Sequence, residues 1–228
     1  MLSASTLAPQ DFNDIQAVVV WLHGMGEEPM TMLDVAAASG LAEIGVESIA
    51  LKAPMKHASQ ITGEIVDAWF DQEFAHLEMS NRTEFWEAVN RVDEYVDSLA
   101  DHDSTPRLVI AGFSQGAALA LAELMSHPDK FHAALLYSPY RVIDISLLSR
   151  CAMGRGRYPI EHELPRIWIG YGLRDWVIPA RWSYSLVLEL RGLGFDVVTH
   201  HYLGGHVPFG GAESDIRDFL ISSFSSSR

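Results

Sequence analysis

The sequence predicts a single α/β domain in which helices cover both faces of a mostly parallel β-sheet. Short apolar runs of strand length alternate along the chain with segments that have a helical period of three to four residues. The run over residues 17–22 is apolar without alternation, which is typical of a strand buried on both faces. Elements that alternate in this way connect through right-handed crossovers. The chain of 228 residues shows no repeat and no linker, so we expect one domain over residues 1–228.

Six segments have the composition of strands buried in such a sheet. The first reads Ala-Val-Val-Val-Trp-Leu and carries no charged side chain. β-branched and aromatic residues are frequent in the others, which favours strands. The predicted strands are residues 17–22, 46–51, 107–111, 131–137, 167–171 and 195–202.

Four segments have the period of helices. In the first, Phe85, Val89, Val92, Val96 and Leu99 follow one another at alternating steps of four and three residues, which places them on one helix face. The second is apolar nearly all round, so we expect it to be buried. The predicted helices are residues 85–99, 116–125, 180–191 and 212–224.

The charge balance excludes some classes of function. Acidic residues number 30 and basic residues 16, which gives a net charge of −14. Proteins that bind nucleic acid neutralise phosphates with basic groups, so we expect no nucleic-acid partner. The same charge disfavours an anionic lipid surface. The lone cysteine, Cys151, forms no disulfide within the chain.

Nothing in the sequence signals export or membrane insertion. Residues 1–14 contain no Lys or Arg and no apolar stretch of a signal peptide. No apolar run approaches the roughly 18 residues of a membrane span. We therefore expect a cytoplasmic protein without stable membrane insertion, with flexible ends at residues 1–14 and 222–228.

A candidate nucleophile follows the third predicted strand, at the sheet edge where ligands of parallel sheets bind. Gly112-Phe113-Ser114-Gln115-Gly116 is a G-x-S-x-G motif between a strand and a helix, the context that the motif requires. A serine presented on a sharp turn needs small neighbours two residues away on either side. The following helix directs its N-terminal N–H groups at the turn. The alternative is a tight turn with an incidental serine.

The first predicted strand ends in His23-Gly24-Met25-Gly26. Backbone N–H groups in such a turn are not obstructed by side chains, so they can donate to an oxyanion together with the N–H of Gln115. We interpret His23 as a residue that shapes this loop. An ordinary glycine turn is the alternative.

Two further strand-end loops complete a candidate triad. Asp175 follows the fifth predicted strand and His206 follows the sixth. The chain order Ser114, Asp175, His206 is the Ser-Asp-His order of α/β-hydrolases. His200, His201 and His206 cluster in sequence but lack the spacing of a zinc site, so we expect no metal and no other cofactor.

These motifs resemble those of the phospholipase/carboxylesterase family, which includes acyl-protein thioesterases. The likeness extends from about residue 15 to 220 and is weakest over residues 141–166. Three positions depart from the family's pattern: Glu27 replaces the usual aspartate, Ala117 a glycine, and Tyr171 a histidine. The segments that carry the resemblance are Leu22-His23-Gly24-Met25-Gly26, Trp69-Phe70-Asp71, Gly112-Phe113-Ser114-Gln115-Gly116, Asp175-x-x-x-Pro179 and Gly205-His206.

The resemblance implies an α/β-hydrolase fold without a large cap domain. It implies an enzyme that hydrolyses carboxylic esters through an acyl-enzyme, with catalytic Ser114, Asp175 and His206. It also implies an oxyanion hole made by the N–H groups of Met25 and Gln115. The partner is then a small-molecule ester or acyl thioester, and dimers among relatives make a homodimer a candidate assembly.

The candidate substrate-binding residues are Met55, Trp69 and Phe70, with core packing as the alternative. An uncapped cleft predicts a preference for short to medium acyl chains. Three alternatives stay open: an acyl-protein thioesterase, a lysophospholipase, and a non-catalytic binding protein of the same fold. Arginines around Cys151 form either a solvated loop or a clamp for an anionic substrate group.

Overall fold

A computed structural model describes residues 2–11, 15–59, 61–73, 78–79, 82–99, 106–142 and 164–225. Most of the segment 141–166, including Cys151 and the arginines beside it, lies outside these residues. Residue 1 and residues 226–228 also lie outside them.

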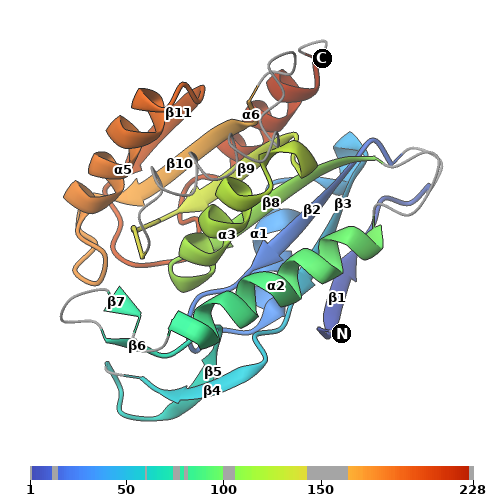
Figure 1. Cartoon of the computed structure of the whole chain (residues 1–228). Coiled ribbons are helices and arrows are strands. Elements are labelled where there is room, and N and C mark those ends of the chain that lie inside the picture. Colours follow the sequence, from blue (N-terminus) through green and yellow to red (C-terminus); the bar gives the residue numbers. More distant parts are fainter. Residues whose placement is uncertain are drawn as a thin grey trace.

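The described residues form a seven-stranded sheet in the order β1-β3-β2-β8-β9-β10-β11 (Figure 1). All neighbouring strands are parallel except β1, which runs antiparallel to β3. The predicted α/β fold is therefore confirmed, and all six predicted strands are present with small shifts at their ends. The strands are β1 (Ala4–Leu7), β2 (Ala17–Leu22), β3 (Val46–Leu51), β8 (Arg107–Phe113), β9 (Ala133–Tyr137), β10 (Arg166–Gly172) and β11 (Val197–Tyr202).

Helices cover both faces of the sheet (Figure 1). One core contains side chains of α2 (Arg82–Leu99), α3 (Gln115–Ser126) and α5 (Ala180–Gly192). The other contains side chains of α1 (Pro29–Ala38) and α6 (Glu213–Ser225).

Strand β2 shows why a central strand can be apolar throughout. Val18, Val20 and Leu22 belong to the first core, whereas Val19 and Trp21 belong to the second. Successive side chains of a strand point to opposite faces, so a strand between two helix layers buries every position.

Several short elements were not predicted. Besides α1 and β1, they are two 3₁₀ turns (Ala42–Ile44 and Pro128–Lys130) and two small antiparallel pairs. One pair joins β4 (Met55–Ala58) to β5 (Ile65–Ala68), and the other joins β6 (Gln72–Glu73) to β7 (Glu78–Met79).

Part of each segment that was expected to be flexible belongs to a regular element. Residues 4–7 pair with β3, with Ala4 opposite Leu51. Their side chains are not buried, so they leave no apolar run in the sequence. Helix α6 continues to Ser225. The hydroxyl of Ser223 donates to the carbonyl of Phe219 within the helix.

The sheet has a topological switch point between β2 and β8. The chain leaves β2 for β3 on one side and later returns to β8 on the other side. In open α/β sheets, ligands usually bind at the carboxyl ends of the strands beside such a point. Within the described part of the chain, no helix combines the length and apolarity needed to cross a membrane.

Candidate active site

Ser114 occupies a strained turn between β8 and α3. Its backbone has φ 53° and ψ −117°, a conformation that non-glycine residues rarely adopt. The Ser114 N–H donates to the carbonyl of Tyr137 over 3.0 Å, and the Ser114 carbonyl accepts from the Ala118 N–H over 3.0 Å. Both bonds hold the turn against the sheet and the first turn of α3.

The two glycines of the motif are required by close backbone contacts. A Cβ atom on Gly112 would lie 2.4 Å from the carbonyl oxygen of Gly116. A Cβ atom on Gly116 would lie 2.1 Å from the carbonyl oxygen of Leu22, at the end of β2. Since these obstacles are backbone atoms, no side-chain rearrangement would relieve them. The serine turn and the loop after β2 are therefore packed directly against each other.

The structure brings Ser114, His206 and Asp175 together from three separate loops. His206 Nε2 lies 2.9 Å from Ser114 Oγ, and His206 Nδ1 lies 2.7 Å from Asp175 Oδ2. The ring of His206 also packs on Phe113, with ring centroids 4.7 Å apart. When Nδ1–H donates to Asp175, the neutral imidazole leaves Nε2 free to accept the proton of the serine.

Asp175 is buried in a set of hydrogen-bond donors. Its Oδ1 accepts from the N–H groups of Val177 and Ile178 over 2.9 and 2.7 Å. Its Oδ2 accepts from the hydroxyl of Ser138 over 2.9 Å, in addition to His206. Burial alone raises the pKa of Asp175, but the bonds from His206, Ile178 and Ser138 outweigh it and hold the pKa below its usual range.

Sequence reasoning missed Ser138. It follows β9 at the same edge of the sheet, is fully buried and has a positive φ of 48°. A serine directly after a buried strand was the available signal. The bond to Asp175 is visible only after folding.

Met25 and Gln115 have unpaired backbone N–H groups. Neither N–H donates to an acceptor among the described residues. The neighbouring N–H groups are engaged: Gly24 donates to Glu27 Oε2 over 2.9 Å, and Gly26 donates to the carbonyl of Asp67 over 2.8 Å. Polar groups in folded proteins are rarely left without a partner, so two free donors in adjoining loops are available for a ligand oxygen.

His23 supports the loop and is fully buried. The Ala53 N–H donates to its Nε2 over 3.1 Å, and its Nδ1 lies 2.8 Å from the Gly24 carbonyl. An acceptor at Nε2 requires the neutral ring with its proton on Nδ1. Burial lowers the pKa of His23, which agrees with the neutral form. Burial has the opposite effect on the carboxyl group of Glu27 and raises its pKa, although the bond from the Gly24 N–H lowers it.

The burial of two of the three candidate substrate-binding residues corrects the role that was predicted for them. The side chains of Trp69 and Phe70 are completely inaccessible to solvent and belong to the core between α2, α3 and the sheet. This burial contradicts the prediction that they line a substrate groove. Aromatic residues suit either place, and the local sequence does not distinguish a cleft wall from a core. Met55, in β4, is half-buried and keeps its place as a candidate.

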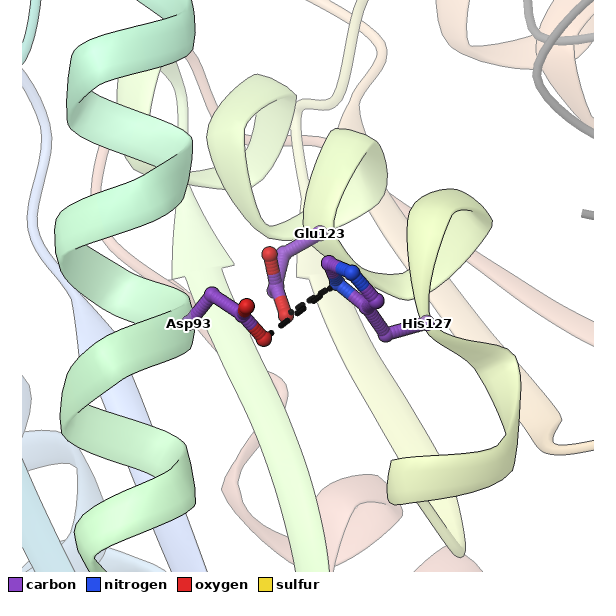
Figure 2. Close-up of side chains that lie close together, drawn as sticks. All are labelled: Asp93, Glu123 and His127. Atoms are coloured by element: carbon purple, nitrogen blue, oxygen red, sulfur yellow. Dashed lines mark hydrogen bonds and ion pairs between the residues drawn. The ribbon is translucent and has the colours of Figure 1, made fainter. Parts of the chain in front are cut away.

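A cluster of possible metal ligands lies between α2 and the end of α3 (Figure 2). His127 Nδ1 lies 3.0 Å from Glu123 Oε1 and 3.3 Å from Asp93 Oδ1. The ammonium group of Lys130 binds the same Asp93 oxygen. Burial raises the pKa of Glu123 to about 7. A cation would have to displace both Lys130 and a proton, so we interpret the cluster as an internal hydrogen-bonded network.

The histidines considered earlier do not gather at a metal site in the described structure. His200 Nδ1 pairs with Asp215 Oδ2 over 3.0 Å, and His206 is engaged by Ser114 and Asp175. Neither is part of the ligand-like cluster.

The sheet is doubly wound and mostly parallel, and a serine lies on a strained turn after one of its strands. An aspartate and a histidine follow the serine in chain order and lie within hydrogen-bond distance in the fold. These features define an α/β-hydrolase. The chain belongs to the phospholipase/carboxylesterase family, whose model matches residues 8–220. The resemblance inferred from the motifs is thereby confirmed.

Known proteins similar to this chain include thioesterases and esterases. It is 26% identical over 180 residues to acyl-protein thioesterase 1 of Cryptococcus neoformans, covering 75% of this chain and 71% of the relative. It is 26% identical over 203 residues to a probable carboxylesterase of Oryza sativa, covering 84% and 71%. The crystal structure of Zea mays acyl-protein thioesterase 2 superposes with a TM-score of 0.75 at 18% identity, covering 98% of this chain and 99% of that one. This last likeness confirms the fold.

Proposed function

We propose that the protein is a serine hydrolase that cleaves carboxylic esters through an acyl-enzyme. The observation that carries this proposal is the hydrogen-bonded path from Ser114 Oγ through His206 to Asp175, with distances of 2.9 and 2.7 Å. A serine hydroxyl is a weak nucleophile unless a base is positioned to take its proton. The family match supports an ester hydrolase, and this geometry supplies the parts that such a reaction requires.

In the first half-reaction Ser114 Oγ attacks the carbonyl carbon while His206 Nε2 takes the hydroxyl proton. The carbonyl oxygen becomes an oxyanion held by the N–H groups of Met25 and Gln115. The Asp175 carboxylate stabilises the imidazolium and keeps Nδ1 protonated. His206 then gives its proton to the leaving oxygen or sulfur as the bond to the acyl carbon breaks.

In the second half-reaction water attacks the acyl-enzyme. His206 removes a proton from the water, and a second tetrahedral intermediate forms in the same oxyanion site. Collapse returns the proton to Ser114 Oγ and releases the carboxylic acid. No residue of the described site is left in a changed state.

Acyl thioesters are the second candidate substrate class. Proteins named acyl-protein thioesterase are among the relatives of this chain. The proposed machinery acts on either bond, because the same tetrahedral oxyanion forms from an ester and from a thioester. The leaving group is therefore decided by the surroundings of Ser114.

A kinetic panel tests the proposal. Wild-type protein is assayed on esters of graded acyl length beside matched thioesters, and its active serine is titrated with a fluorophosphonate probe. We expect turnover and stoichiometric labelling at Ser114. A folded wild-type protein that neither turns over any member of the panel nor reacts with the probe would favour the non-catalytic binding protein.

A further inference from the structure

Trp69 is hydrogen-bonded to both of the loops that contain Met25 and Gln115, whose N–H groups have no acceptor among the described residues. Its indole Nε1–H donates to the carbonyl of His23 over 2.8 Å, two residues before Met25. Its backbone N–H donates over 2.8 Å to the side-chain oxygen of Gln115, the residue after Ser114. One buried residue thus connects the loop after β2 with the first residue of α3.

The side chain of Gln115 completes this connection. Its Nε2 donates to the carbonyl of Phe70 over 2.8 Å, while its Oε1 accepts from Trp69. The amide therefore pairs with the main chain of residues 69 and 70 on both sides. Since Gln115 is almost completely buried, breaking either bond would leave a polar group unsatisfied in the core.

The indole bond distinguishes Trp69 from other buried tryptophans. Trp21 and Trp168 are equally inaccessible, yet neither indole N–H has an acceptor among the described residues. Apolar packing alone is therefore enough to hold a tryptophan in this core. The bond from Trp69 to His23 is a separate feature that acts on the loop of Met25.

We propose that Trp69 is a positioning residue that keeps the N–H groups of Met25 and Gln115 oriented toward the same oxyanion. The inference rests on the proposed function, and it replaces the expected role of Trp69 as a substrate contact. Donors of an oxyanion site are effective only when they are already oriented before charge develops. The hydrogen bonds of Trp69 to His23 and Gln115, together with the bond of Gln115 to Phe70, form a tether between the two loops that provides this orientation.

The test compares Trp69→Phe with Trp168→Phe, which removes the same indole group where its N–H has no acceptor in the described part of the chain. For Trp69→Phe we expect kcat to fall about 10- to 100-fold while KM stays within about twofold, since oxyanion contacts form in the transition state. Inhibition by a trifluoromethyl ketone, whose adduct carries an oxyanion, weakens by a similar factor. Trp168→Phe leaves these values close to wild type.

Hydrogen exchange provides a readout that does not depend on turnover. Freed from the indole, the His23 carbonyl no longer anchors its loop, so amides of residues 23–28 exchange faster in Trp69→Phe than in Trp168→Phe. If wild-type protein proves inactive, the proposed function fails, but this comparison still tests the tether. Unchanged exchange overturns the tether whatever the activity.

Three results would overturn the positioning role. They are equal kcat values in the two variants, a loss expressed in KM alone, and undiminished inhibition by the ketone. If Trp69→Phe does not fold, Gln115→Met removes the other bonds of the tether while keeping the length of the side chain. It must then lower kcat without a matching change in KM.

Discussion

Single side chains in the active site perform separable tasks. Ser114 would supply the nucleophile, His206 the base, and Asp175 the fixed negative charge beside it. Sequence motifs identified these three residues because each lies in a strand-end loop. Ser138, which lies in the same kind of loop, was missed because a single serine there has no motif around it.

Replacing Ser114 tests the nucleophile directly. We expect Ser114→Ala to fold, because the turn already accepts a small side chain, and to lose about 10⁶-fold in kcat. Ser39→Ala is the matched control, since Ser39 is also buried and its hydroxyl, among the described residues, bonds only to the carbonyl of Val35 in α1. Ester hydrolysis at the wild-type rate by folded Ser114→Ala would exclude the assignment.

Two variants that affect the carboxylate of Asp175 should lower kcat to different degrees. Asp175→Asn replaces an acceptor by an amide that cannot orient the imidazole, and losses of about 10⁴-fold in kcat are known for such a change in a serine protease. Ser138→Ala removes one bond to the carboxylate. Because Asp175 keeps its bonds from Val177, Ile178 and His206 in this variant, we expect a smaller loss of kcat than for Asp175→Asn. Steady-state kinetics would contradict this order if Ser138→Ala were the more severe variant.

At the level of elements, the contact between α3 and the end of β2 has no free space. Gly116→Ala would place a methyl group 2.1 Å from the Leu22 carbonyl oxygen. We expect the free energy of unfolding to fall by about 2 kcal/mol or more, as for other overpacked sites. Denaturant titration of Gly192→Ala is the control, because nothing lies within 4 Å of a Cβ at that position. Equal stability of the two variants would contradict the steric argument.

The packing of α2 on α3 contains a titratable network. Glu123 is completely buried beside Asp93 and His127 (Figure 2). Lys130 binds Asp93 and Asp97. Burial raises the pKa of Glu123 from 4.5 to about 7. The folded protein therefore holds a proton that the unfolded chain releases at lower pH.

This proton makes stability depend on pH with a definite sign. The contribution of this proton to the free energy of unfolding is fully present below pH 4.5, the pKa of an ordinary glutamate. It is lost as pH rises through about 7. We expect the free energy of unfolding of wild type to fall relative to Glu123→Gln between pH 5 and 8, by up to about 3 kcal/mol. Glu87→Gln, on the exposed face of α2, is the control. A difference independent of pH would show that Glu123 is ionised throughout.

The prediction of elements from the sequence was best for buried strands and poor for exposed ones. The apolar run of β2 is explained by burial on both faces. Strands β1 and β4 alternate between exposed and half-buried positions over four residues each. Such short strands are stabilised by pairing with a neighbour, so their own composition carries little signal.

At the scale of the whole molecule, the sheet order places the site. Loops after β2, β8, β10 and β11 meet at one edge because these strands are parallel. Residues 92 positions apart in the chain, Ser114 and His206, are thereby brought within 2.9 Å.

No large cap domain covers the site within the described residues, which limits the acyl chains that it can enclose. Each buried methylene contributes about 0.8 kcal/mol, so kcat/KM rises with chain length only while apolar surface continues. Because Trp69 and Phe70 are core residues, less wall is available than the sequence suggested. We expect the highest kcat/KM on short to medium acyl esters, measured from acetyl to palmitoyl. A steady rise to palmitoyl would instead favour the acyl-protein thioesterase or lysophospholipase alternatives.

The sequence by itself determined the fold class, the positions of the six core strands along the chain and the identity of the candidate triad. Each of these is encoded locally, in an apolar run or in a short motif with its glycines. Only the tertiary structure decided that Ser138 bonds to Asp175, that Glu123 is buried beside His127, and that Trp69 lies in the core with its indole on His23. These facts depend on which distant segments pack together, and the packing of side chains between layers leaves no periodic mark in the chain.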